Sequence, residues 1–201
     1  MFGGVGAVGG ASKFGDIVPV PGPGVELSGI ELQYLTYDGS SDEEEFYIWD
    51  GDGNVWLRQG WEDATDMPIP PGQGMWVGNG SYGEVKFQSA GEVRQSEIEF
   101  PINDEGGTAV GNSFPCAITF NDITPIPGPG VELSGIELQY LTYDGSSDDE
   151  EFYIWDGDSN IWLRQGWEEA TDMPIPAGKG MWVGNGSYGQ VTIHISAPEF
   201  N

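Results

Sequence analysis

Two closely similar turns carry the residues whose types and spacing best suit a metal site. Oxygen-bearing side chains alternate along WDGDGN (49–54) and WDGDSN (155–160), as Asp50, Asp52 and Asn54 in one turn and Asp156, Asp158 and Asn160 in the other. Hard oxygen ligands on a tight glycine turn suit Ca²⁺. An EF-hand would need glycine in place of Val55 and glutamate in place of Trp61, so that motif is absent. The alternative is an ordinary hairpin turn rich in Asp, Gly and Asn.

Tryptophan is the second chemically suggestive residue type, with four copies in each half of the chain. Exposed indole rings stack on sugar rings, and the candidates for glycan stacking are Trp56, Trp61, Trp162 and Trp167. The alternative is that these rings pack in the core. A carbohydrate-binding or cell-surface adhesion module is therefore one function that the sequence supports.

Catalytic chemistry finds little support. His194 is the only histidine and Cys116 the only cysteine, and neither has a plausible partner nearby in sequence. The chain has no P-loop, GxSxG, HExxH or CxxC pattern. We therefore expect that the protein is not an enzyme.

The charge excludes several partners. With 33 acidic and six basic residues the formal charge is −27, which argues against nucleic acid and anionic membranes. Acidic runs such as SDEEE (41–45) and SDDEE (147–151) either attract a cation or are solvated. No apolar run is long enough to span a membrane. The opening 14 residues have no basic stretch ahead of their apolar part, so they are not predicted to be a signal peptide.

An internal repeat organises the chain. A shift of 106 places lays residues 22–83 over residues 128–189, and only six of those 62 positions differ. The match collapses at both ends. The second copy is preceded by QSEIEFPINDEGG (95–107), in which Ile98, Phe100 and Ile102 alternate as in a strand, and the first copy has no such segment. One copy is therefore predicted to lack a strand that its twin has.

The elements that carry these residues are predicted to be strands. Residues 29–37, 45–49, 54–59, 74–77 and 84–87 have strand-like composition and are separated by turn signals rich in glycine. The one helical candidate is WEDATDM (61–67). We predict an all-β fold of two tandem antiparallel β-sandwich or barrel-like domains, residues 1–94 and 95–201.

The opening segment suggests assembly. It combines glycine, alanine and valine in Gly3, Gly4, Val5, Gly6, Ala7, Val8, Gly9, Gly10 and Ala11. Such a segment suits an extended strand in a groove where backbones approach closely. We expect a neighbouring subunit to hold it by strand addition, because the first copy lacks an edge partner.

Part of the chain resembles a known kind of module. AVGNSFPCAITFNDI (109–123), GIELQYLT, FYIWDGD and IPAGKGMWV (175–183) resemble β-rich repeats of large secreted bacterial surface proteins, where VGNxFP, NDI and PxGxGxWV recur. The likeness covers most of residues 96–200, and the first copy lacks VGNSFP. The resemblance implies an extracellular scaffold and no activity.

Together these features favour an extracellular structural protein. Its copies are expected to polymerise head to tail by strand addition into a filament, tube or sheath, stabilised by calcium. The expected partners are other copies of the chain, with no nucleic acid and no membrane span. A glycan is the partner in the alternative function, the carbohydrate-binding or adhesion module.

Overall fold

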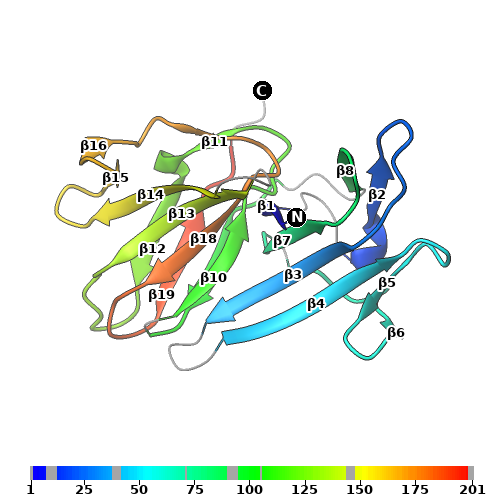
Figure 1. The fold of residues 1–201 in the computed structure, drawn as a ribbon. Coiled ribbons are helices and arrows are strands. Elements are labelled where there is room, and N and C mark those ends of the chain that lie inside the picture. The colour runs from blue at the N-terminus through cyan, green and yellow to red at the C-terminus, as the bar shows by residue number, and fades with distance from the viewer. Residues whose placement is uncertain are drawn as a thin grey trace.

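The computed structural model describes residues 2–7, 13–37, 42–70, 72–89, 95–104, 106–143 and 148–198. These residues form strands joined by turns, with two single-turn 3₁₀ helices, η1 (Phe14–Asp16) and η2 (Phe120–Asp122) (Figure 1). The all-β prediction is confirmed, and none of the sheets closes into a barrel. No helix among the described residues has the length and apolar character needed to cross a membrane.

The strands of the two copies follow the same order. The first copy contains β1 (Phe2–Ala7), β2 (Ile17–Pro21), β3 (Ile30–Tyr37), β4 (Asp42–Asp50), β5 (Val55–Arg58), β6 (Glu62–Asp63), β7 (Gly74–Asn79) and β8 (Val85–Ser89). The second contains β9 (Ile98–Ile102), β10 (Gly107–Gly111), β11 (Ile118–Thr119), β12 (Ile123–Pro127), β13 (Ile136–Tyr143), β14 (Asp148–Asp156), β15 (Ile161–Arg164), β16 (Glu168–Glu169), β17 (Pro174–Ile175), β18 (Gly180–Asn185) and β19 (Val191–Ile195).

One local prediction needs correction. Residues 61–67 form β6 and a turn, because the Ala64 N–H bonds across to the Trp56 carbonyl at 2.7 Å and Trp61 has a positive φ of 64°. Neither feature belongs to a helix. The acidic runs lie partly in strands, since β4 begins at Asp42 and β14 at Asp148.

One long sheet joins the two copies. Its main path runs β16-β15-β14-β13-β18-β10-β3-β4-β5-β6, and β1 and β7 branch from it (Figure 1). The junction is short, with Gly107 opposite Tyr37 and Thr108 opposite Thr36. Reciprocally, β1 of the first copy lies against β13 of the second. Because β1 matches β10 and β3 matches β13, the two contacts between the copies are equivalent. Such a reciprocal contact closes on itself and does not propagate.

Each copy has its own hydrophobic core, built around a matching aromatic cluster. Phe14 stacks on Tyr47 with ring centroids 3.8 Å apart, and Phe120 stacks on Tyr153 at 4.2 Å. Trp56 and Trp162, at 0% and 1% exposure, pack beside these pairs. Their indole N–H groups donate to carbonyl oxygens of Ile17 (2.9 Å) and Ile123 (2.8 Å).

Two of the four tryptophans predicted to stack on glycans are in the core. Trp56 and Trp162 are fully buried, so neither can stack on a sugar, and the core alternative holds for both. The physical reason is strand phase: β5 and β15 turn these two positions towards the core.

The buried indole of Trp162 gives a stability prediction. Trp162→Ala should cost about 3–5 kcal/mol, because it removes a large packed ring and leaves the Ile123 carbonyl without its donor. Trp167→Ala, at an exposed position, should cost less than about 1 kcal/mol. Denaturant unfolding of both variants checks this, and equal losses would contradict the assignment of Trp162 to the core.

Candidate functional site

The glycine-rich opening strand is used within its own chain. β1 pairs antiparallel with β7, with Val5 opposite Trp76 and Ala7 opposite Gly74. β10 takes the matching place beside β18, where Ala109 lies opposite Trp182. The expectation that a neighbouring subunit holds this segment is thus replaced, over residues 2–7, by pairing in the same chain. Val8, Gly9, Gly10 and Ala11 lie outside the described residues.

Backbone and tryptophan approach closely beside β18. A Cβ on Gly107 of β10 would collide with the ring of Trp182. The equivalent position of β1 is Phe2, opposite Gly78, so this contact does not explain the Gly/Ala/Val composition of β1. The sequence predicted the extended form of this segment and misassigned its partner.

The last strands of the two copies differ in their neighbours. In the second copy β19 lies between β12 and β9, whereas in the first copy β8 pairs with β2 alone among the described residues. β8 and β19 occupy equivalent places, because Val85 aligns with Val191 and Phe87 with Ile193. In the part of the chain that the structure describes, no strand therefore covers the edge of β8 that faces away from β2.

Register shows which backbone groups face that edge. The Gly22 N–H donates to the Glu84 carbonyl at 2.9 Å, so these two residues form a hydrogen-bonded pair. Hydrogen-bonded pairs alternate along an antiparallel ladder, and Pro19 and Pro21 fall in the intervening pairs, where no N–H is needed. The N–H and C=O groups of the residues opposite Ile17, Pro19 and Pro21 consequently point away from β2. Those residues are Val85, Phe87 and Ser89.

The same reasoning holds in the second copy, where the edge is covered. The Gly128 N–H donates to the Gln190 carbonyl at 3.0 Å, which turns the outward groups of Val191, Ile193 and Ile195 towards β9. Their partners are Ile102, Phe100 and Ile98. The twin strand thus satisfies the backbone groups that β8 leaves facing outward.

The outer edge of β2 is protected in a way that β8 is not. Two of the three outward-facing residues of β2 are Pro19 and Pro21, which have no N–H to offer. Proline on an edge strand is a common device against unwanted pairing. β8 contains no proline, although its solvent face carries the exposed Lys86. The two-stranded sheet is therefore open to a further strand on one side only.

Side-chain burial agrees with an incomplete layer. Val191 and Ile193 of β19, which pairs with β9, are fully buried. Their counterparts Val85 and Phe87 are only partly buried. The side chains that complete the second layer are Ile98, Phe100 and Ile102, all in the core. Partly exposed apolar side chains therefore accompany the backbone edge of β8.

An asparagine occupies the same position in both copies. Asn185 donates its side-chain N–H groups to carbonyls of Asn103 (2.8 Å) and Gly189 (3.0 Å), which ties it to the β9–β10 corner. Asn79, its counterpart, donates to the Gly83 carbonyl at 3.1 Å. The bond within the turn is thus common to both copies, and the second copy adds the bond to the β9–β10 corner.

Amide hydrogen exchange should report the difference directly. We expect the amides of Val85, Phe87 and Ser89 to exchange roughly 100-fold or more faster than those of Val191, Ile193 and Ile195, because only the latter are bonded to a neighbouring strand. Exchange measured residue by residue by NMR checks this. Slow exchange at Phe87 in the monomer would show that some other segment already pairs with the edge.

The Asp/Asn turns are accounted for by local backbone bonding. The Asp52 N–H donates to Asp50 Oδ1 at 3.1 Å, and the Asp158 N–H donates to Asp156 Oδ1 at the same distance. Asn54 adopts the left-handed conformation at φ 53°, as does Asn160 at 54°, and asparagine tolerates this region well. Within the described ranges, no three or more His, Cys, Asp or Glu residues are grouped to hold a metal ion. A calcium site at these turns stays a prediction.

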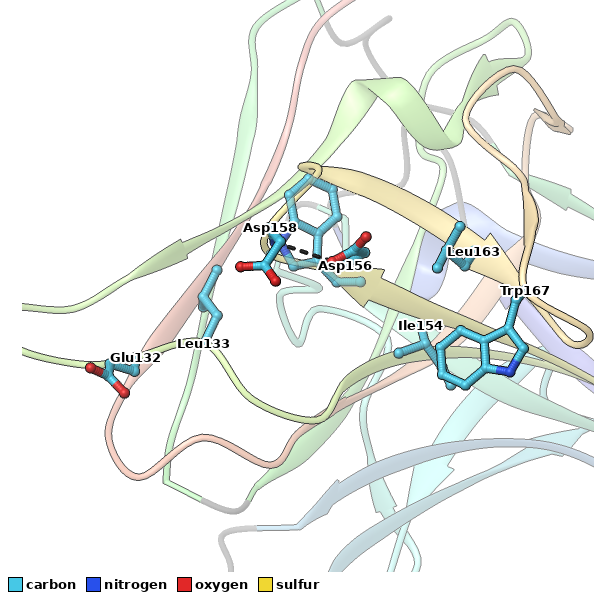
Figure 2. Close-up of a pocket in the computed structure, with 9 residues that line it drawn as sticks. Glu132, Leu133, Ile154, Asp156, Asp158, Leu163 and Trp167 are labelled. Atoms are coloured by element: carbon cyan, nitrogen blue, oxygen red, sulfur yellow. Dashed lines mark hydrogen bonds between the residues drawn. The ribbon is translucent and has the colours of Figure 1, made fainter.

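A pocket of about 630 Å³ opens beside the second of these turns (Figure 2). It is lined by Glu132, Leu133, Ile154, Trp155, Asp156, Gly157, Asp158, Leu163 and Trp167. Figure 2 shows Trp167 beside Ile154, with the two aspartates between them and Glu132. The pocket combines an aromatic face, an apolar floor and three carboxylates, and its size is that of a small-molecule site. Sequence reasoning found the aspartates and Trp167 but missed the apolar floor.

The tryptophan of this pocket has a strained backbone. Trp167 has a φ of 66° and is 74% exposed, and its counterpart Trp61 has a φ of 64° and the same exposure. The left-handed region costs a bulky L-residue roughly 1–2 kcal/mol, and glycine is its usual occupant. Core packing does not explain the choice of tryptophan at these two turns, because most of each ring lies in solvent.

Several titrating groups are shifted by their surroundings. Hydrogen bonds from Ser159 and the Asp158 backbone hold the pKa of Asp156 below its usual value, so this pocket carboxylate stays ionised. Burial lowers the pKa of Lys179. Burial and a hydrogen bond to Glu151 raise the pKa of Tyr153 to about 12, and Tyr47 shifts in the same direction for the same causes.

The Tyr153 shift predicts a loss of stability at alkaline pH. The unfolded tyrosine ionises near 10 and the folded one near 12, so the stabilisation is complete below pH 10 and declines as the pH rises towards 12. The wild-type free energy of unfolding should therefore fall over this window, and Tyr153→Phe should fall less. Urea titrations at stepped pH check this, and identical pH profiles would contradict it.

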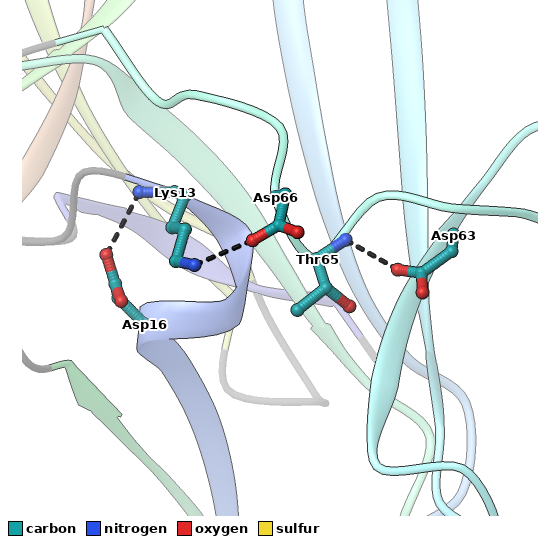
Figure 3. A network of polar contacts seen from close by, with 5 residues as sticks. All are labelled: Lys13, Asp16, Asp63, Thr65 and Asp66. Carbon is teal, nitrogen blue, oxygen red and sulfur yellow. Dashed lines mark hydrogen bonds and ion pairs between the residues drawn. The ribbon is translucent and has the colours of Figure 1, made fainter.

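A polar network anchors the start of the first core (Figure 3). The Lys13 ammonium donates to Asp66 Oδ1 at 2.7 Å, and the Lys13 N–H donates to Asp16 Oδ2 at 3.1 Å. Nearby, the Thr65 N–H donates to Asp63 Oδ1 at 2.8 Å. These contacts fix η1 against the turn after β6, which positions β2 for its pairing with β8.

The remaining chemically reactive residues do not come together. His194 Nε2 lies 3.3 Å from Glu97 Oε2 on the outer face of the β9–β19 pair. Cys116 is partly buried beside the second core, where its carbonyl accepts from the Asn112 side chain. The absence of catalytic chemistry stays a prediction.

Comparison with known proteins supplies no relative. No family model, no curated protein and no solved structure matches the chain. The resemblance to repeats of secreted surface proteins therefore stays a prediction, and function has to be argued from the geometry.

Proposed function

We propose that this chain is a non-catalytic structural protein. Separate chains assemble by addition of a strand at the edge of β8 that faces away from β2. The observation that supports the proposal is the contrast between β8 and β19, two equivalent strands of which only β19 has a second neighbour among the described residues. Strand addition supplies main-chain hydrogen bonds for affinity and side-chain slots for specificity. Both are available at β8, in the outward backbone groups and in the partly exposed Val85 and Phe87.

The chemistry of the incoming strand follows from β9. It must come from another subunit and carry bulky apolar side chains at three alternate positions, as Ile98, Phe100 and Ile102 do in the second copy. The opening segment has bulky residues three apart, at Phe2 and Val5, so its pattern does not match this slot.

The arrangement favours open polymers. The contact between the two copies within a chain is reciprocal and closed, so growth has to use another surface. Each chain offers one β8 edge, and a donor elsewhere on a neighbouring subunit gives a head-to-tail contact that extends into a filament, tube or sheath. Chains of charge −27 repel one another, so calcium or other cations would promote assembly by screening. An extracellular location is part of the proposal, and it rests on the resemblance.

A peptide of residues 95–104, QSEIEFPIND, tests the acceptor. Added in excess to the full chain, it should slow the exchange of the Val85, Phe87 and Ser89 amides and shorten or prevent polymers seen by negative-stain microscopy. The same peptide with serine at its three apolar positions is the control and should do neither. Polymers that form unchanged with the native peptide bound at β8 would contradict assembly through this edge.

A pair of variants separates the backbone from the side chain. Phe87→Pro removes an outward N–H without touching a bond to β2, whereas Phe87→Ala loses the ring and keeps the N–H. We expect Phe87→Ala chains to polymerise and Phe87→Pro chains to stay dispersed, as judged by sedimentation. Equal polymerisation of the two variants would rule out pairing at this residue.

A further inference from the structure

We infer that the pocket beside Trp167 binds neutral polysaccharide, with the indole face as a stacking platform and the carboxylates as hydrogen-bond acceptors. Trp167 projects beside the exposed Ile154, and Asp156 and Asp158 line the same pocket (Figure 2). A pyranose ring has an apolar face of C–H groups and a rim of hydroxyl donors, which matches an aromatic face bordered by carboxylates.

The charge of the pocket narrows the ligand class. Glu132, Asp156 and Asp158 are carboxylates, and no lysine or arginine lines the pocket. Acidic sugars such as uronates would be repelled, especially because Asp156 stays ionised. Neutral sugars donate their hydroxyl hydrogens to carboxylates without this penalty, so a neutral chain of pyranose rings fits best.

The backbone of Trp167 is a second, independent reason to assign it a ligand. Glycine would occupy its left-handed turn without strain, yet both copies place an exposed tryptophan there, at φ 64° and 66°. A residue that strains the backbone and packs little is retained most simply for contact with another molecule.

The residues that form the pocket occur twice in the chain. The counterparts of all nine lining residues are identical in the first copy: Glu26, Leu27, Ile48, Trp49, Asp50, Gly51, Asp52, Leu57 and Trp61. Trp61 and Ile48 are exposed there as Trp167 and Ile154 are in the second copy. Two equal sites on one chain bind a polymer with a higher apparent affinity than one site does. Loss of one site removes this increase in affinity.

Variants to glycine provide the test, because glycine relieves the strained φ and should keep the fold intact. The probes are cellulose, xylan, mannan and starch as neutral polymers and alginate as an acidic one. We expect retention on at least one neutral polymer and none on alginate. Trp61→Gly and Trp167→Gly should each weaken binding roughly 100-fold, and the double variant should abolish it.

The control is Tyr82→Ala combined with Tyr188→Ala, which removes two exposed aromatic rings outside the pocket and should leave binding unchanged. The melting temperature of the double glycine variant should equal or exceed that of the wild type. Absence of binding to every neutral polymer, equal loss in the tyrosine control, or a large drop in melting temperature on Trp→Gly would each overturn the proposal.

Discussion

Backbone hydrogen bonding at a sheet edge is the constraint on which the rest of this structure depends. A strand inside a sheet has donors and acceptors on both sides, and a strand with one neighbour leaves half of them to water or to another chain. Here equivalent strands occur twice, and within the described ranges β19 has two neighbouring strands and β8 has one. The two copies can therefore be compared within one chain, and β19 shows how a strand equivalent to β8 pairs when it has a neighbour on each side.

The two copies share their cores and differ in their flanks. Stacked Phe–Tyr pairs, indole-to-carbonyl bonds and the long strands recur almost unchanged. The tyrosines and tryptophans lie in the nearly identical residues 22–83 and 128–189, and their partners Phe14 and Ile17 match Phe120 and Ile123 just before those ranges. In the segments before the repeat, β1 pairs with β7 in the first copy as β10 pairs with β18 in the second. Among the described residues, the second copy alone adds a further strand, β9, beside its last strand β19.

The sequence predicted the all-β fold, because turn signals and alternation such as that in residues 98–102 are local features. It did not predict where the glycine-rich segment pairs. That segment was expected to be held by another subunit, because the first copy was predicted to lack a strand, whereas residues 2–7 pair with β7. Pairing between distant strands, such as Val5 opposite Trp76, leaves no local signal. Likewise, composition could not separate the buried Trp56 from the exposed Trp61 five residues later. That distinction depends on strand phase and on a left-handed turn.

We propose that separate chains join through β8, and a structure of the assembled form by electron cryomicroscopy tests this proposal most directly. The account predicts density for an additional antiparallel strand from a neighbouring subunit, hydrogen-bonded to Val85, Phe87 and Ser89, with apolar side chains over Phe87. A polymer in which the β8 edge faces solvent, or in which subunits join only through exchange of β1, would contradict it.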